Sequence, residues 1–193
     1  MTDYRCSPGG FVFEEAMKKD FLQCGYIMIR NLLDQEEVKK IRTSLENSED
    51  LQKNAFGVDD DNGKTSKLVI WKHPGNDVTG MLGRCEKVVS TCEKLLDGEV
   101  YHYHTKLMMK EPFTGGSFIW HQDYGYWYHN GFLTPDMMTV FFHLDKCIKE
   151  NGCLEVPDSA IRECTNLDCT GKDFMDPKKD NNIKYTEDKS KAS

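Results

Sequence analysis

The chain has 193 residues and a mass of 22.3 kDa, which suits one domain with a core large enough to fold without crosslinks. Its formal net charge is −7, so we do not expect a broad nucleic-acid-binding surface, because such domains usually carry a basic excess. No apolar run approaches the roughly 18 residues of a membrane span, and the first residues lack a signal-peptide core. The eight cysteines form no CxxC pair, so we expect free thiols and a cytoplasmic protein.

The first part of the chain is expected to alternate helices with short strands. Asp34 with Glu37 three residues later is typical of a capping box at a helix start, and Gly25 is a typical helix stop. A stretch rich in Asp, Asn, Gly and Lys indicates a polar loop. Together the patterns predict helices over 13–24 and 34–47, strands over 26–29 and 68–71, and the loop over 54–66.

The clearest helical pattern begins after Asp77. Apolar residues recur at spacings of three and four up to Leu96, and Asp97-Gly98 ends the predicted helix. Beyond it the apolar period changes to two, which predicts strands over 100–110, 117–121, 137–144 and 153–156. Helices and short strands followed by consecutive strands favour an α+β protein, with an antiparallel sheet or barrel backed by helices.

The C-terminal part of the sequence has a different character. The character changes at Pro157, and residues 162–193 carry equal numbers of basic and acidic residues, few large apolar ones and no visible period. Such a segment offers little apolar surface to offset its ordering entropy. We therefore expect one folded unit over 1–157 and a divergent, disordered tail over 158–193.

The most informative motif is the pair His121 and Asp123. In an extended strand, residues two apart point to the same side, so an imidazole and a carboxylate would converge. These are two of the three ligands of the 2-His-1-carboxylate triad, which holds Fe(II) and leaves positions open for O₂ and a cosubstrate. The spacing alone favours a surface His and Asp at a strand end, so the surrounding sequence must decide.

Three stretches around this motif carry a family resemblance. The segments 104–112, 118–123 and 151–154 resemble the phytanoyl-CoA dioxygenase family of Fe(II)- and 2-oxoglutarate-dependent oxygenases. The sequence HQDYGYW is most similar to the proline-4-hydroxylase-like and ectoine-hydroxylase-like branches. The resemblance implies a double-stranded β-helix, the jelly-roll or cupin-like barrel, backed by the N-terminal helices.

The resemblance also implies residue roles. His121 and Asp123 match the first two iron ligands, and no catalytic residue is expected beyond the metal ligands. Lys106, Met108 and Phe141 fall where the family surrounds 2-oxoglutarate, and a lysine suits that anion. Phe118 and Trp127 match positions that line the substrate pocket. An outward-pointing Lys106 and purely structural core aromatics remain the plainer alternatives for these positions.

The sequence departs from the family after Asp123. The family takes its third iron ligand from a histidine on a late barrel strand and binds 2-oxoglutarate with a downstream arginine, and neither has a match here. His129 lies too near Asp123 to come from a distant strand. His143 is either a surrogate ligand or, as we favour, a buried core histidine. We therefore expect a barrel that is incomplete at its C-terminal end.

Two hypotheses about function follow. The first is an Fe(II)- and 2-oxoglutarate-dependent oxygenase that uses O₂ to hydroxylate a small organic substrate, with a free amino acid, a small zwitterion or an acyl-CoA all open. The alternative is a truncated, catalytically impaired relative that acts as a binding or regulatory protein. A structural zinc protein is disfavoured because no Cys/His quartet has the usual spacing. We expect no nucleic-acid or membrane partner, and the oligomeric state stays open.

Overall fold

The computed structural model describes residues 2–118, 121 and 123–156. The predicted tail over 158–193 therefore lies outside the described residues. Within them, the elements follow in the order β1 (Asp3–Arg5), α1 (Glu15–Cys24), β2 (Met28–Arg30), α2 (Gln35–Glu46), α3 (Glu49–Lys53), β3 (Phe56–Asp59), β4 (Thr65–Trp71), α4 (Val78–Leu82), α5 (Glu86–Leu96), β5 (Thr105–Met109), α6 (Asp123–His129) and the 3-10 helix η1 (Lys149–Asn151).

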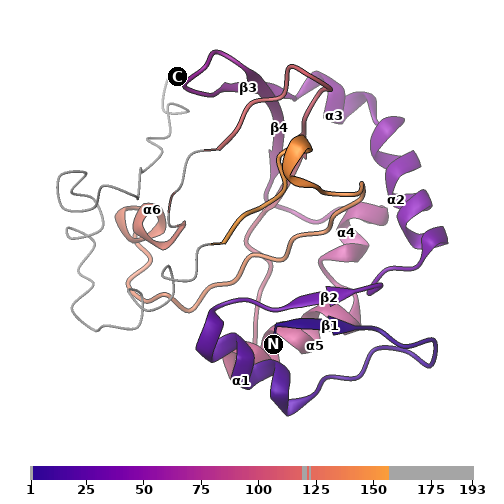
Figure 1. Ribbon diagram of the computed structural model, residues 1–193, viewed down its shortest axis with the longest axis vertical. Coiled ribbons are helices and arrows are strands. Elements are labelled where there is room, and N and C mark those ends of the chain that lie inside the picture. The colour runs from indigo at the N-terminus through magenta and orange to yellow at the C-terminus, as the bar shows by residue number, and fades with distance from the viewer. Residues whose placement is uncertain (1, 119–120, 122, 157–193) are drawn as a thin grey trace.

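Two small sheets organise the described part of the chain. Strands β3, β4 and β5 form an antiparallel sheet in that order, and β1 pairs with β2 in parallel. In the larger sheet Leu68 lies opposite Met108, and Ile70 lies opposite Lys106. Because partners across a ladder point to the same face, these four side chains share one face of the sheet. Figure 1 shows α2 on one side of β4 and α6 on the other.

The core lies where β4 meets the helices. Its buried apolar side chains come from α1, α2, β4 and α5: Met17, Ile41, Leu68, Val69, Val88 and Leu95. Adjacent residues Leu68 and Val69 point to opposite faces, so the middle of β4 is covered on both sides. Burial of each such side chain stabilises the folded state by about 1.5–3 kcal/mol. This packing fixes β4, and through the ladder it fixes β5, which carries Lys106.

The predicted helix boundaries are largely confirmed. Asp34 accepts a hydrogen bond from the Glu37 amide at 2.7 Å, and the Glu37 carboxylate accepts from the Asp34 amide at 2.8 Å, which completes the capping box. Helix α1 ends at Gly25, whose φ of 73° lies in the left-handed region that favours glycine. These local signals succeed because caps depend on neighbours in sequence.

The single helix predicted after Asp77 is wrong in one respect, because the structure divides it into α4 and α5. Asp77 does cap α4, accepting from the Gly80 amide at 2.9 Å. A Cβ atom on Gly80 would lie 2.0 Å from the Gly75 carbonyl oxygen, and one on Gly83 would lie 3.2 Å from the His102 ring. Between the two helices Cys85 has an extended backbone as the N-cap of α5, so the helix is interrupted there although the apolar pattern continues.

Several predicted strands are also wrong. The described parts of 117–121, 137–144 and 153–156 are not strands, although 105–109 within the predicted 100–110 is. Conversely, the predicted loop over 54–66 contains β3, and residues 123–129 form α6. A strand requires a partner for its backbone groups, and alternation alone supplies none. The described residues thus form mixed helices and sheets, as predicted, but no closed barrel.

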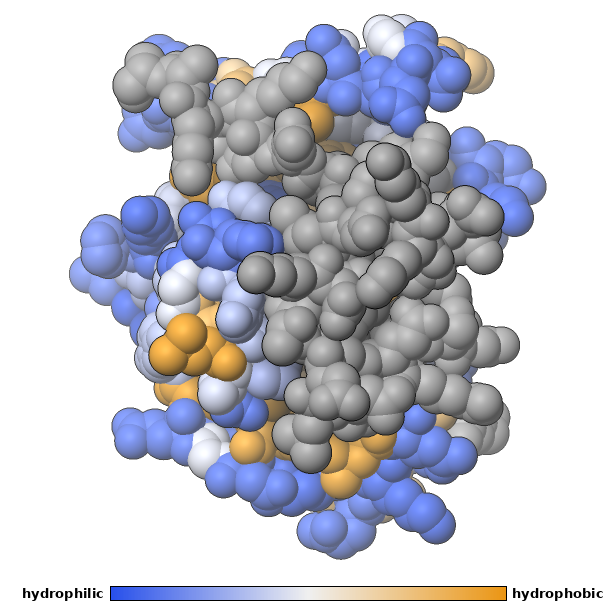
Figure 2. Space-filling view, turned by 90° about the vertical axis from the view of Figure 1, so that its left-hand side faces the viewer, coloured by the Kyte–Doolittle hydropathy of each residue, from blue (hydrophilic) through white to orange (hydrophobic). Residues whose placement is uncertain are grey.

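The surface gives two further observations. Seen from the side of α6, the described residues present a mainly hydrophilic surface on which apolar side chains form small separate groups (Figure 2). Among the described residues, no helix is both long enough and apolar enough to cross a membrane.

Candidate metal centre

His121 and Asp123 lie next to each other in the structure. The Nε2 atom of His121 is 3.3 Å from Oδ1 of Asp123, and both side chains stay accessible to solvent. The two converge because Asp123 begins α6, not because they share a strand face as the sequence predicted. The imidazole and the carboxylate therefore meet as expected, but at the start of a helix and not on a strand.

The separation of the two donors suits a shared metal ion. Adjacent ligands of an octahedral ion with bonds of about 2.1 Å lie roughly 3 Å apart, close to the 3.3 Å between these atoms. Among the described residues, no group of three His, Cys, Asp or Glu side chains is placed to hold a metal ion. The two residues therefore fit as two ligands of a facial triad, and the described part of the chain supplies no third.

Asp123 has surroundings that favour a charged carboxylate. The hydrogen bond from His121 and the charge of that ring lower the pKa of Asp123, with Lys106 and a hydrogen bond from Thr139 acting in the same direction, while burial opposes them. An anionic carboxylate is the form that binds a metal ion. Thr139 was missed by sequence reasoning, since nothing in a predicted strand marks one hydroxyl among its neighbours.

Lys106 is a cation whose charge acts on Asp123. It lies on β5, where its charge lowers the pKa of Asp123 and also that of His104, whose pKa is lowered mainly by burial. Lys106 and Met108 share a sheet face, and Met108 is 40% exposed. The charge of Lys106 thus acts on the side chains of both Asp123 and His104.

An aromatic cluster adjoins the pair. Trp127 lies one helical turn after Asp123 and packs edge-on against Tyr103, Phe132 and Tyr126, with ring centroids 4.9–5.6 Å apart. Its ring centroid is also 5.5 Å from that of His104. Trp127 thus lies on the same helix as Asp123, and its role in lining a substrate pocket stays a prediction. Tyr103 and Phe132 are additional members of the cluster that sequence reasoning missed.

Other predicted site residues are less closely tied to this centre. Phe118 is half-buried, three residues before His121. Phe141 is 51% exposed and stacks on the ring of His143 at 6.5 Å. His143 itself is exposed and lies 3.1 Å from the Cys147 sulfur, so the expectation of a buried core histidine is wrong. His129 ends α6 and contacts Tyr128.

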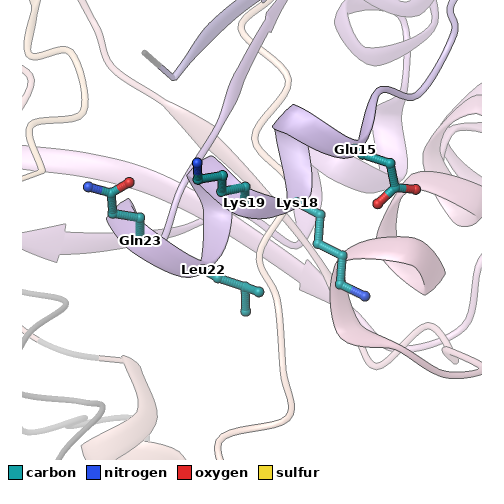
Figure 3. Close-up of a pocket in the computed structure, with 5 residues that line it drawn as sticks. All are labelled: Glu15, Lys18, Lys19, Leu22 and Gln23. Carbon is teal, nitrogen blue, oxygen red and sulfur yellow. The ribbon is translucent and has the colours of Figure 1, made fainter.

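A shallow hollow elsewhere carries no comparable chemistry. It is lined along one exposed helix, α1, by Glu15, Lys18, Lys19, Leu22 and Gln23 (Figure 3). Figure 3 shows the side chains pointing away from the helix in several directions instead of converging. Lys18 already forms an ion pair with Asp97, the residue that caps the C-terminal end of α5. We therefore assign the candidate site to the neighbourhood of His121 and Asp123.

Comparison with known proteins defines the class to which this fold and site belong. The pattern of the phytanoyl-CoA dioxygenase (PhyH) family matches residues 21–191. The chain belongs to this family of cupin-like, Fe(II)- and 2-oxoglutarate-dependent dioxygenases. No solved structure shows a significant match to the chain.

Three relatives illustrate the branch. An L-proline trans-4-hydroxylase from Streptomyces griseoviridis is 31% identical over 68% of this chain and 49% of the relative. A probable alpha-ketoglutarate-dependent hypophosphite dioxygenase from Stutzerimonas stutzeri is 30% identical over 71% and 50%. An ectoine dioxygenase from Bordetella parapertussis is 23% identical over 83% and 54%. The predicted branch is confirmed, and the chain spans about half the length of these relatives.

Proposed function

We propose that the chain carries the iron- and cosubstrate-binding part of an oxygenase that hydroxylates a small organic substrate. The observation that supports this most directly is the convergence of His121 and Asp123, 3.3 Å apart, within the electrostatic reach of Lys106. On this proposal Fe(II), 2-oxoglutarate and O₂ together supply the oxidation of a C–H bond when they are bound. The described sheet then forms one part of a double-stranded β-helix.

Each residue of the candidate site has a role in this proposal. His121 and Asp123 hold the metal on one side, and the Thr139 hydroxyl keeps the Asp123 carboxylate in position. Lys106 attracts the doubly charged cosubstrate, while Met108 and Phe141 supply apolar contacts beside it. Trp127 and Phe118 form an aromatic wall that excludes water from the reacting bond.

For the substrate we propose a small zwitterion or a free amino acid. Relatives carry names that specify L-proline and ectoine. The aromatic rings around Trp127 offer flat faces that suit a compact ring or a cationic amine. We propose a cytoplasmic location, supported by free thiols at all six described cysteines.

A second candidate function is binding or regulation without turnover. It is favoured by one observation: the described residues supply two metal ligands and no third, and both are accessible to solvent. A site with two protein ligands holds metal and cosubstrate weakly. Such a chain would act as an impaired relative that binds a ligand or a partner.

One experiment separates these candidates. The purified chain is incubated with Fe(II), 2-oxoglutarate and O₂, and succinate release is measured with L-proline or ectoine present. If the chain is an oxygenase, succinate release should depend on iron and O₂. If it is a binding protein, no succinate should be released.

The variant Asp123→Ala tests the site. It should abolish succinate release and weaken Co(II) binding, measured anaerobically by visible absorption, because a charged ligand is lost. The matched control is Asp61→Ala, since Asp61 is an exposed aspartate on the turn between β3 and β4. Unchanged Co(II) affinity in Asp123→Ala would overturn the assignment of the ligands.

A further inference from the structure

A hydrogen-bonded turn holds two cysteines at its ends. Cys147 precedes and Cys153 follows the residues 148–152, which include η1. The side chain of Asn151 accepts from the Ile148 amide at 2.9 Å and donates to the Lys146 carbonyl at 2.7 Å. The Cys153 amide donates to the Ile148 carbonyl at 3.1 Å. The chain therefore already turns back on itself, so a bond between its ends requires little further loss of entropy.

The turn is also fixed to the body of the protein. The ammonium group of Lys110, just after β5, donates to the Gly152 carbonyl at 3.3 Å. On the other side Arg42 of α2 pairs with Asp145 at 2.6 Å. Figure 1 shows η1 in front of the sheet in this view. These contacts hold the two cysteines near each other in the folded state.

Cys147 has a base beside it. Its sulfur lies 3.1 Å from Nδ1 of His143, and both side chains are exposed. Burial raises the pKa of the Cys147 thiol, as do the neighbouring Cys153 and Asp145, with Lys110 opposing. A protonated thiol needs a base when it attacks an electrophile, and the His143 ring is positioned to take that proton.

We propose that Cys147 and Cys153 form a dithiol that hydrogen peroxide oxidises to a disulfide, with His143 as the base. Cys147 sulfur attacks one peroxide oxygen as its proton passes to His143, and the O–O bond breaks. The departing hydroxide takes that proton from His143 and leaves as water, so a sulfenic acid remains on Cys147. Cys153 sulfur then displaces the second water and forms the S–S bond. In sum, two thiols and one peroxide give one disulfide and two waters. This site is independent of the proposed function.

The other described cysteines serve as internal references. Cys85 contacts the Leu82 carbonyl and Cys6 the Ser7 carbonyl. Among the described cysteines, Cys147 is the one whose sulfur contacts an imidazole ring. Cys147 is also the exposed member of the described cysteines, the other five being half-buried, so a histidine variant is needed to separate the effect of exposure from that of the base.

The test uses the full, reduced chain without added metal. It is exposed to hydrogen peroxide, alkylated and mapped by mass spectrometry. We expect a disulfide joining Cys147 to Cys153. In Cys153→Ser we expect a sulfenic acid on Cys147 that dimedone traps. Predominant pairing of either cysteine with a different thiol, or sulfenic acid forming as fast on Cys6 or Cys24, would overturn the proposal.

The histidine is tested with a matched pair of variants. His143→Gln should slow disulfide formation by at least roughly a hundredfold, the low end of what a positioned base contributes. His73→Gln replaces an exposed histidine in the turn after β4 and should leave the rate unchanged. Equal rates in wild type and His143→Gln would show that the imidazole is no base here.

Discussion

At the scale of single residues, the candidate centre depends on what surrounds Asp123. Its carboxylate is contacted by His121, receives a hydrogen bond from Thr139 and lies in the field of Lys106. Convergence of the first pair could be predicted from the spacing of the motif. The contribution of Thr139 could not, because it comes from a segment sixteen residues away whose predicted strand is absent from the structure.

Thr139 provides a test at this scale. Thr139→Val removes the hydroxyl and should weaken Mn(II) binding to the chain by about 10-fold or more, the range for groups that orient metal ligands. Thr139→Ser keeps the hydroxyl and should restore most of the affinity. Binding is measured anaerobically by electron paramagnetic resonance of free Mn(II).

A control distinguishes this effect from general destabilisation. Thr114→Val changes an exposed threonine away from the centre and should bind Mn(II) like wild type. If Thr139→Ser binds as weakly as Thr139→Val, the hydrogen bond to Asp123 has no part in metal binding.

At the scale of elements, prediction succeeded where the signal is local. The capping box at Asp34 and the glycine that ends α1 were predicted because their hydrogen bonds join near neighbours. Helix α6 was missed since its aromatic-rich sequence has modest helix propensity and follows a motif that we expected on a strand. The division between α4 and α5 was missed because the apolar spacing continues through Cys85, the extended residue that separates the two helices.

Asp60 joins two elements and gives a prediction for acid stability. Its carboxylate accepts from the amides of Lys64 at 2.8 Å and Ser117 at 3.1 Å, so it ties the β3–β4 turn to the segment that leads to His121. These backbone hydrogen bonds, that of Ser117 first, lower the pKa of Asp60 below its usual 3.8. A lowered pKa in the folded state stabilises the protein above pH 3.8, and this contribution is lost as pH falls through the folded pKa.

The measurement compares urea unfolding at pH 6 and at successively lower pH. Asp60→Asn should be less stable than wild type at pH 6, and the difference should shrink as the pH falls below 3.8. Asp61→Asn changes the neighbouring exposed carboxyl and should follow the wild-type curve. A constant difference between Asp60→Asn and wild type across this range would contradict the role given to the charge.

At the scale of the whole molecule, the described residues form two small sheets and a helical layer, and the chain spans about half the length of its curated relatives. The family match runs to residue 191 and so includes most of the segment that we predicted as a divergent tail. The two findings lead to different expectations for that segment, which lies outside the described residues.

Limited proteolysis decides between these expectations. From the sequence we predict that a protease of broad specificity cleaves within 158–193 first and leaves a fragment ending near Val156, because this segment has few apolar residues and many charges. Fragment masses give the cleavage sites. If the segment resists protease as long as α5 does, it is folded, and a search for the third metal ligand belongs there.

The position of Trp127 on the same helix as Asp123 has a consequence for ligand binding. Asp123 begins α6 and Trp127 follows one turn later, so the two move together when the helix shifts or rotates. In the proposed site, a substrate that presses on the indole ring would also reorient the carboxylate at the metal. Affinity for metal and affinity for substrate would then depend on each other, and by thermodynamic necessity each would change the other by the same factor.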